Sequence, residues 1–374
     1  MKWEKGNVFD LCDINPENIS RNYPHDFIRY FDITSVGSGV VTSNDEIPLS
    51  EAPLRAKRVV RKDDTILATV RPGNRSFYYF KSPFENSIVS TGFAVLRPKA
   101  NKTDPRFLYY LISEPGFTAY LVAYEQGANY PAVNPDIIGG KPIEFPPLPT
   151  QRKIASILSA YDDLIENNLK RIKLLEEKAF LIYKLIVQTE KLEEFTIEEL
   201  AYVIMGQSPT SDTYTNEKED NLPFHQGVTN FSNYFVEHRI YCNAPIKIAE
   251  EGDILFSVRA PVGRINFTSD KICIGRGLCA FRSKKGFQNY FYHQLKEFFF
   301  AEDVIGNGAI FNAVTKVELM KVKLKTPSDK IQQEFEVEAE QMYNLILNLT
   351  KQNTKLREAR DILLPRLMNG EVEV

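Results

Sequence analysis

Basic residues gather in two stretches of this 374-residue chain, although its formal net charge is -3. The first stretch, residues 55–81, holds eight Lys or Arg against Asp63 and Asp64. The second, residues 239–285, holds nine basic residues against four acidic ones. Cations concentrated at two places in a balanced chain are typical of surfaces that contact phosphate groups. The alternative interpretation is two solvated loops without a ligand.

These cations, with polar side chains on adjacent loops, are the candidates for contact with a duplex nucleic acid, whose base edges are exposed in the major groove. The candidates in the first half are Arg55, Lys57, Arg58, Arg61, Arg71, Arg75, Lys81, Asn129 and Tyr130. Those in the second half are Gln226, Asn230, Asn233, Arg239, Lys247, Arg259, Arg264, Arg276 and Lys284. The amide and phenol side chains among them fit an ordinary turn or surface position equally well.

Residue types that carry catalysis are present without the spacing that catalysis requires. The four histidines have no carboxylate or cysteine at a telling spacing: they are His25, His225, His238 and His293. Gly275, Gly277 and Ala280 form a G-x-G-x-x-A string, but no helix is expected after it, and a dinucleotide site requires one.

Two weaker catalytic patterns fail as well. Residues 221–224 only partly resemble the N-P-P-F tetrad of amino-methyltransferases, and Glu176 with Lys178 has no nearby aspartate for nuclease chemistry.

The four cysteines form no CxxC pair and no metal-spaced cluster, so we expect reduced thiols. No apolar run is long enough for a spanning helix. The sequence therefore predicts a cytoplasmic protein with no active site, metal or cofactor.

An internal duplication supplies the elements that must position the cations. Gly127, Ala132 and Gln151 recur as Gly308, Ala313 and Gln332, each pair separated by 181 positions. This period is too long for a solenoid unit and fits a domain followed by a helix. Two similar domains indicate that the recognised object is itself bipartite.

Each domain is expected to be mixed, with a strong β component. The runs TILATVRP and ILFSVRAP are short and β-rich, and they align Ile66 with Ile254 and Arg71 with Arg259. A second pair of strands, residues 90–99 and 275–284, is followed by aromatic segments with helical character. A polar stretch at 206–221 predicts a surface loop.

Two long helices follow the domains. Positions spaced by four and three residues are apolar in nearly every case from Ile154 onward, and a matching row begins at Phe335. Heptads sustained over this length predict a coiled coil, with Thr150 and Ser328 as N-caps.

Asn168 and Asn353 interrupt these two rows. In a parallel pairing each amide would face hydrocarbon, whereas antiparallel pairing brings the two amides together. The sequence thus favours an antiparallel pair with Asn168 facing Asn353. The alternative is that each asparagine lies at a frayed or rotated position.

The chain resembles the specificity subunit of type I restriction-modification systems. The resemblance spans the whole chain and rests on four motifs: PPLPTQRKIASIL at 146–158, LLPRLMNGEV at 363–372, GQSP at 206–209 and YFDITSV at 30–36. It implies two target recognition domains that each read half of a split double-stranded DNA site. It also implies two copies of a methyltransferase subunit docked on the helices, which recruit the restriction subunits.

The resulting expectation is an α+β, pseudo-twofold chain with no catalysis of its own. Its expected parts are a first recognition domain at 1–149, a spacer helix at 150–190, a second recognition domain at 191–327 and a second spacer helix at 328–374. Two other classes stay open from the residues alone, namely a coiled-coil scaffold with two protein-binding domains and a stand-alone enzyme.

Overall fold

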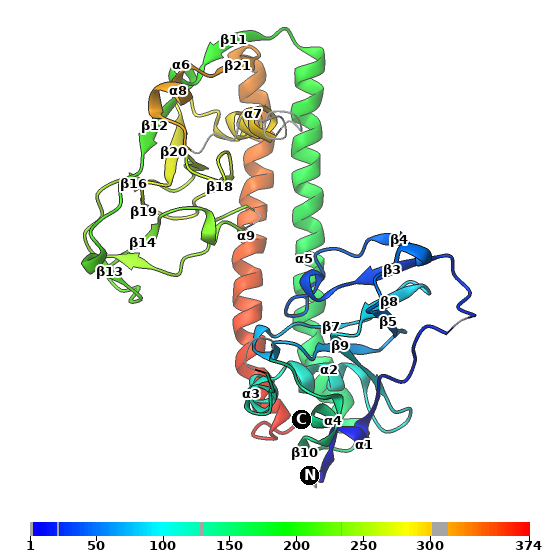
Figure 1. The fold of residues 1–374 in the computed structure, drawn as a ribbon. Helices are drawn as coiled ribbons and strands as arrows, with labels where there is room; N and C mark the ends of the chain where they lie inside the picture. Colours follow the sequence, from blue (N-terminus) through cyan, green and yellow to red (C-terminus); the bar gives the residue numbers. More distant parts are fainter. Residues whose placement is uncertain (1–2, 21, 128–130, 233, 301–312) are drawn as a thin grey trace. The chain divides into compact units, whose positions relative to one another are not determined.

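The computed structural model of the chain describes residues 3–20, 22–127, 131–232, 234–300 and 313–374. It forms two compact units, Met1–Asn167 with Asn353–Val374, and Asn168–Gln352. Each unit holds one β-rich domain and a part of each of two long helices, drawn in green and orange-red (Figure 1).

The domain of the first unit contains three small sheets. A ribbon pairs β1 with β10, one four-stranded sheet has the order β2-β9-β6-β7, and the other has the order β4-β3-β8-β5. The strands are β1 (Glu4–Asn7), β2 (Cys12–Ile14), β3 (Phe27–Phe31), β4 (Glu46–Pro48), β5 (Ala56–Val59), β6 (Thr65–Ala68), β7 (Phe77–Tyr79), β8 (Ser87–Ser90), β9 (Phe93–Pro98) and β10 (Pro142–Phe145). The short helices are α1 (Val8–Leu11), α2 (Pro105–Ser113), α3 (Pro115–Ala123) and α4 (Pro135–Gly140).

The domain of the second unit repeats this plan. A ribbon pairs β11 with β21, and two sheets have the orders β12-β20-β17-β18 and β13-β15-β14-β19-β16. The strands are β11 (Glu193–Thr196), β12 (Ala201–Met205), β13 (Tyr214–Thr215), β14 (Leu222–His225), β15 (Tyr241–Cys242), β16 (Ile248–Ala249), β17 (Ile254–Ser257), β18 (Ile265–Phe267), β19 (Ile272–Ile274), β20 (Leu278–Ser283) and β21 (Lys323–Thr326). The short helices are α6 (Ile197–Leu200), α7 (Gln288–Phe300) and α8 (Lys316–Lys321).

The two domains agree in strand direction as well as order. β3 pairs in parallel with β8, and β14 pairs in parallel with β19, while the neighbouring pairs are antiparallel. Each domain also begins with a ribbon strand and one helical turn that is closed by a capping box. Asn7 N donates to Asp10 Oδ2 at 2.9 Å in the first domain, and Thr196 N donates to Glu199 Oε2 at 2.7 Å in the second. The duplication predicted from the sequence thus extends to local structure.

The two long helices are α5 (Leu148–Thr189) and α9 (Asp329–Met368). Ser328 directly precedes α9, as predicted. Thr150 is not an N-cap, because α5 already begins at Leu148 and accommodates Pro149 in its first turn, where a missing N–H costs nothing.

The rows predicted to form the helix seam are mainly buried. The buried members on α5 are Ile154, Leu158, Ile165, Asn168, Ile172 and Ala179. Those on α9 are Phe335, Ala339, Met342, Ile346, Leu349, Asn353 and Leu367. Burial of each large apolar side chain contributes about 1.5–3 kcal/mol, so this row dominates the stability of both helices.

Each unit ties its own helix segments together. In the first unit Asp162 accepts from Tyr110 Oη at 2.6 Å and from Arg360 Nη1 at 2.5 Å, which joins α2, α5 and α9. In the second unit Lys178 pairs with Glu338 at 2.8 Å. Arg360 occupies a predicted apolar seam position, and its ion pair accounts for the charge there.

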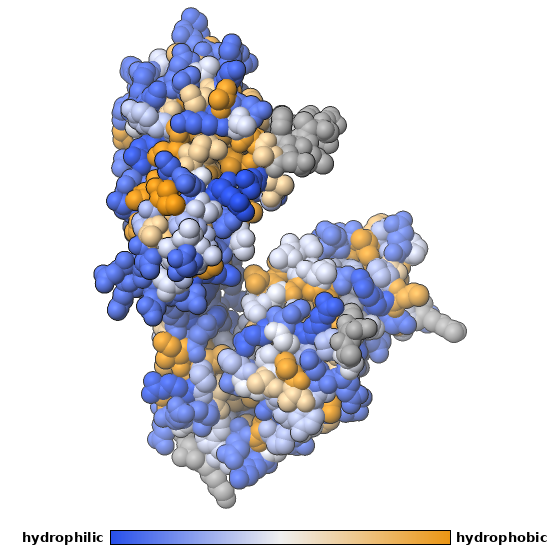
Figure 2. Space-filling model, turned by 60° about the vertical axis from the view of Figure 1, so that its left-hand side comes forward, coloured by the Kyte–Doolittle hydropathy of each residue, from blue (hydrophilic) through white to orange (hydrophobic). Residues whose placement is uncertain are grey.

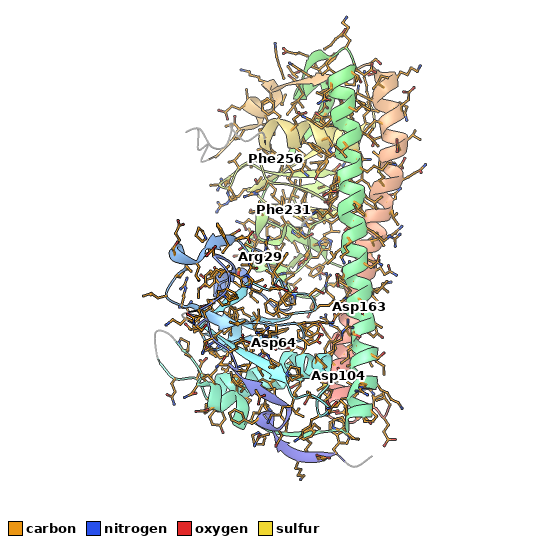
Figure 3. The ribbon with its side chains drawn as sticks, turned by 90° about the vertical axis from the view of Figure 1, so that its right-hand side faces the viewer. Arg29, Asp64, Asp104, Asp163, Phe231 and Phe256 are labelled. Atoms are coloured by element: carbon orange, nitrogen blue, oxygen red, sulfur yellow. The ribbon has the colours of Figure 1, made fainter. Side chains whose placement is uncertain are left out.

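The repeated glutamine of the 181-residue period fixes the start of each long helix. Gln151 is almost fully buried; its amide donates to the carbonyl oxygens of Lys102 and Pro146, and its Oε1 accepts from Asp104 N at 3.0 Å. Gln332 donates to Pro327 O at 3.2 Å. Figure 3 shows Asp104 near the start of α2 and Asp163 on α5.

The remaining expectations have mixed outcomes. The two aromatic segments are helices, α2 and α7, but α3 was not predicted. The 206–221 stretch is mainly loop, interrupted by a turn of 3-10 helix and the short strand β13. Across the described residues, no helix is both long and apolar enough to cross a bilayer.

Candidate nucleic-acid interface

A buried bidentate ion pair occupies the same place in both domains. Asp64, which directly precedes β6, accepts two bonds from Arg97 on β9 at 2.9 and 2.8 Å. Asp253, which directly precedes β17, accepts two bonds from Arg282 on β20, both at 2.7 Å. The aspartates are 0% and 2% exposed. Hydrogen bonding to the carboxylate raises the pKa of each arginine, and each pair fixes the register of its central strands.

These pairs show that the sequence alignment of the two domains was displaced by one residue around β6 and β17. Thr69 N donates to Gly92 O at 2.8 Å, and Val258 N donates to Gly277 O at 3.0 Å, so Thr69 corresponds to Val258. Arg71 therefore corresponds to Ala260.

The predicted equivalence of Arg71 and Arg259 is wrong for this reason. Arg259 occupies the place of Val70, because Val70 and Arg259 form matching bridges to Ala132 and Ala313. Every residue of β6 and β17 is buried, so the apolar pattern fitted both registers.

In the second domain, four chain segments meet where β14, β17 and β19 end, at residues 208, 225–226, 258–259 and 275–277, and we call this place the apex. Gly275 N donates to His225 O at 2.8 Å, Gly277 N donates to Gln226 O at 3.1 Å, and Arg276 N donates to Ser208 Oγ at 3.2 Å. The glycines are required by this close approach. A Cβ added to Gly277 would lie 2.3 Å from Gln226 O.

Three predicted contact residues converge on the apex. Gln226, Arg259 and Arg276 are exposed and line one small depression of about 200 Å³, whose other walls include Val228 and Ser257. Two guanidinium groups and one amide around a single hollow can donate to phosphate oxygens and to base edges. This is the strongest grouping of the predicted residues in the structure.

The first domain builds its corresponding apex around an ion pair. Arg55 donates to Tyr30 Oη at 3.2 Å and forms an ion pair with Asp32, which stands at the end of β3 as Gln226 stands at the end of β14. Thr91 N donates to Arg55 O at 2.8 Å, which attaches this segment to the turn before β9. Exposed Lys57 lies on the adjoining strand β5.

Besides Arg55, four predicted cations of the first domain engage groups of the protein itself. Arg61 binds Glu17 through two bonds of 2.7 and 2.6 Å, and Lys81 pairs with Asp163 at 3.1 Å. Arg58 donates to the carbonyl of Phe93, and burial lowers its pKa. Arg75 donates to Ser113 O at 2.7 Å, and Arg71 is exposed at the start of the turn that follows β6.

The second domain shows a similar division. Arg239 pairs with Glu237 at 3.4 Å, and Lys284 donates to Glu198 O at 2.6 Å. The other predicted residues of this domain are the exposed Lys247 and Arg264 and the half-buried Asn230. Asn129, Tyr130 and Asn233 lie outside the described residues.

The sequence did not reveal a row of hydrogen-bonded polar side chains in the second domain. His225 Nε2 lies 2.9 Å from His238 Nδ1, and His238 Nε2 lies 3.1 Å from Asp270 Oδ2. His238 is therefore paired with a carboxylate, although no histidine has one at a telling spacing in the sequence. The partners are 32 positions apart, so no local motif could reveal them. Burial, followed by the proximity of His238, lowers the pKa of His225 to about 4.

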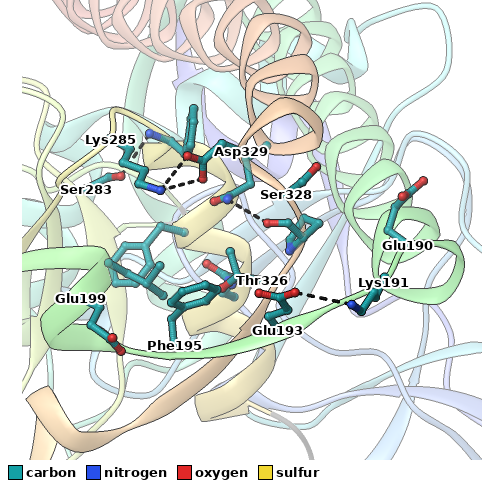
Figure 4. Close-up of a pocket in the computed structure, with 16 residues that line it drawn as sticks. Glu190, Lys191, Glu193, Phe195, Glu199, Ser283, Lys285, Thr326, Ser328 and Asp329 are labelled. Carbon is teal, nitrogen blue, oxygen red and sulfur yellow. Dashed lines mark hydrogen bonds and ion pairs between the residues drawn. The ribbon is translucent and has the colours of Figure 1, made fainter.

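A separate cavity of about 570 Å³ is bounded by β11, β21 and the start of α9. Figure 4 shows two ion pairs in its lining, Lys285 with Asp329 at 2.7 Å and Lys191 with Glu193 at 3.7 Å. The described residues contain no group of three or more metal-ligating side chains. All four cysteines are buried and free.

Comparison with known proteins identifies the duplicated domain. A family model described as the type I restriction modification DNA specificity domain matches residues 1–177 and again residues 189–357. The chain belongs to the type I restriction-modification specificity family. The match covers both copies, in agreement with the resemblance drawn from the sequence motifs.

Individual relatives agree with this assignment. A putative type I restriction enzyme MjaX specificity subunit from Methanocaldococcus jannaschii is 32% identical, over 75% of this chain and 71% of its own length. The type I restriction enzyme HindI specificity subunit from Haemophilus influenzae is 25% identical over 97% and 99%. The type I restriction-modification S subunit from M. genitalium has a similar fold, with a TM-score of 0.65 at 16% identity over 98% and 96% of the two chains.

The family membership confirms the prediction of a DNA-specificity subunit that is not itself an enzyme. It does not favour the protein-binding scaffold.

Proposed function

We propose that this specificity subunit reads a bipartite double-stranded DNA target, with one half-site bound at the apex of each domain. The observation that carries the proposal is the convergence of Gln226, Arg259 and Arg276 on one hollow at the strand ends of the second domain. Side chains projecting from a rigid sheet edge can enter the major groove, where each base pair presents a distinct pattern of donors and acceptors.

The predicted cations divide into two roles. Arg259, Arg276 and Lys247 in the second domain, with Lys57 in the first, supply phosphate and base contacts from exposed positions. Exposed Arg71, at the start of the turn after β6, supplies a further phosphate contact. The cations with protein partners mainly hold the loops in place: Arg55, Arg58, Arg61, Arg75, Lys81, Arg239 and Lys284. Those among them that are exposed supply a second, weaker layer of phosphate contacts. Arg264 and Asn230 flank the second apex, and Asn129 and Tyr130 remain candidates for base contact in the first domain.

The long helices act in this proposal as an antiparallel coiled-coil spacer that relates the domains by a pseudo-twofold axis. Supporting contacts occur within each unit, between Asp162 and Arg360 in the first and between Lys178 and Glu338 in the second. Asp162 lies in the first half of α5 and Arg360 in the last part of α9. Lys178 lies in the last part of α5 and Glu338 in the first part of α9, as antiparallel helices require. Half-sites about 10 base pairs apart, centre to centre, would then face the same side of the duplex.

The partners follow from the family. We propose that two copies of the modification methyltransferase subunit dock on the spacer helices in the cytoplasm, and that restriction subunits join the assembled complex. This chain needs no cofactor in that scheme.

Binding measurements over a range of salt concentrations test the DNA-binding part of the proposal. The complex with its methyltransferase subunits should bind one bipartite duplex at least about a thousandfold more tightly than a scrambled duplex, with affinity falling steeply as salt rises. Equal affinity for both duplexes at every salt concentration would contradict specific recognition.

A further inference from the structure

Leu54 is 92% exposed, the largest exposed fraction recorded for a large hydrophobic side chain in the described residues. It lies in a closed turn, because Ala56 N donates to Pro53 O at 2.8 Å. The next residue, Arg55, is held by Tyr30. Leu54 is thus presented to solvent by a fixed backbone at the first apex.

The second domain presents a similar group. Ala244-Pro245-Ile246-Lys247 repeats the pattern of Ala52-Pro53-Leu54-Arg55. Ile246 is 47% exposed, and the Lys247 carbonyl accepts from Ile274 N at 2.9 Å, directly before the turn that carries Arg276. In both domains the motif leads into the edge strand of a sheet, β5 or β16. Figure 2 shows that hydrophobic residues form scattered orange patches on a largely hydrophilic surface.

The surroundings of both aliphatic groups define the ligand chemistry. Leu54 is followed by Arg55 and Lys57, and Ile246 is followed by Lys247. A ligand that satisfies both features carries dense negative charge and also presents small apolar groups at its accessible edges. Duplex DNA does so, because each thymine places its 5-methyl group in the major groove beside the phosphate backbone.

We propose that Leu54 and Ile246 each contact a thymine 5-methyl group, one in each half-site of the target. The inference rests on the proposed function and adds a specificity-determining residue to each domain. A branched aliphatic side chain gains contact area with the methyl group and gains none at cytosine, so each half-site contains a thymine at the position facing this turn.

Deoxyuridine substitution tests the inference with a change of one methyl group. In the assembled methyltransferase complex, the thymines of the bound duplex are replaced singly by deoxyuridine. We expect one sensitive thymine in each half-site, with affinity reduced roughly fourfold, the effect of leaving about one methyl group unburied. Leu54→Ala should lower affinity by a similar factor and abolish the sensitivity to deoxyuridine at the thymine of one half-site. Ile246→Ala should have the same two effects at the thymine of the other half-site.

Matched variants separate this contact from general effects. Val40→Ala removes a side chain that is 57% exposed in the same domain, and it should leave both affinity and deoxyuridine sensitivity unchanged. Leu54→Ile keeps a branched aliphatic side chain and should bind the duplex more tightly than Leu54→Ala, close to the affinity of the unaltered complex. Melting curves of all variants should coincide, because exposed side chains contribute little to folding.

The outcomes distinguish the two levels of the proposal. If Leu54→Ala and Ile246→Ala retain full deoxyuridine sensitivity while Arg259→Ala weakens binding, the methyl contact is wrong and DNA recognition stands. If the unaltered complex shows no sequence preference, the proposed function itself is wrong.

Discussion

Single side chains at the two apexes separate into anchors and candidates for ligand contact. Arg282 is committed to Asp253 by two short bonds, whereas Arg259 is exposed at the apex depression. We expect Arg259→Ala to weaken specific DNA binding by about 1–3 kcal/mol with an unchanged melting temperature. Arg282→Ala should lower the melting temperature. Binding curves measured beside melting curves check both expectations, and a destabilised Arg259 variant with normal affinity would reverse the assignment.

The buried ion pairs give a stability prediction. Asp253→Ala leaves Arg282 without its carboxylate, and removal of one partner of a buried pair costs about 3 kcal/mol when the other is half-exposed. Glu250→Ala is the matched control in the same turn, since its 3.5 Å pair with Lys271 is exposed and contributes less than about 1 kcal/mol. Chemical denaturation measures the two free energies of unfolding. Equal losses would show that the buried pair has no special structural role.

Two buried histidines predict loss of stability in mild acid. Burial lowers the pKa of His293 to about 3 and that of His225 to about 4, from an ordinary value of 6.5. Below pH 6.5 the unfolded chain therefore binds protons that the folded chain rejects, so stability falls as the pH falls toward these values. Lowering the pH to 5.5 should cost about 1.4 kcal/mol for each histidine.

The corresponding measurement is thermal melting at pH 7.5 and 5.5. His293→Phe keeps a ring in the cluster and should reduce the pH-dependent loss, whatever its effect on stability at pH 7.5. His25→Phe is the control, and it should keep the full dependence. An unchanged slope in the His293 variant would contradict the assignment.

The sequence was sufficient to predict the correspondence of some of these residues between the two domains, but not of others. Gly92 aligns correctly with Gly277, and Arg97 with Arg282, because a glycine before each strand and an arginine near its end mark the register. The aspartate partners escaped notice, since nothing local links Asp64 to a residue 33 positions away. The one-residue error at Arg71 and Arg259 arose where uniform burial removes the alternation that sets register.

At the scale of elements, long periodic segments were predictable and short ones were not. The two long helices, the aromatic helices α2 and α7, and the central strands all stand where the sequence indicated. One-turn helices such as α1 and two-residue strands such as β15 leave too few residues for a period to show. Tertiary pairing, not local propensity, decides such segments.

The helix seam carries a prediction of its own. Asn168 is 1% exposed and donates to Gln352 Oε1 at 3.0 Å, directly beside Asn353 in the sequence. We propose that Asn168 and Asn353 meet across an antiparallel seam, with Gln352 as an additional acceptor. Replacing either asparagine with Leu should cost about 1–3 kcal/mol, because it strands a buried amide. Replacing both should cost less than the sum of the single changes.

A double-mutant cycle by chemical denaturation measures this coupling. Asn167→Leu, at the neighbouring exposed position of α5, is the control and should be nearly neutral. Absence of coupling between Asn168 and Asn353 would contradict their pairing.

At the scale of the whole molecule, duplication is the feature from which most of the function could be predicted. Two copies of a specificity domain imply two half-sites, whereas the DNA sequence read by each copy depends on individual side chains at the apex. The alignment of the repeats revealed that there are two half-sites, but it cannot reveal the DNA sequence that each domain reads. The partner subunits were implied by family resemblance rather than by any surface pattern.

The chain alone should bind DNA weakly and transfer no methyl groups, because the methyltransferase subunit is proposed to supply the catalytic site. Methyl transfer from S-adenosylmethionine by the purified chain would contradict the role of a recognition subunit. A catalytically inactive methyltransferase partner is the control for contamination.

The central claim is that each domain of this specificity subunit reads one half of a split DNA target. It is tested most directly by co-expression with a methyltransferase subunit, followed by genome-wide mapping of methylated adenines. We predict one bipartite motif with half-site centres about 10 base pairs apart, and Arg259→Ala should relax or reduce recognition in one half only. A single contiguous motif, or loss of both halves in a folded Arg259→Ala variant, would contradict the account.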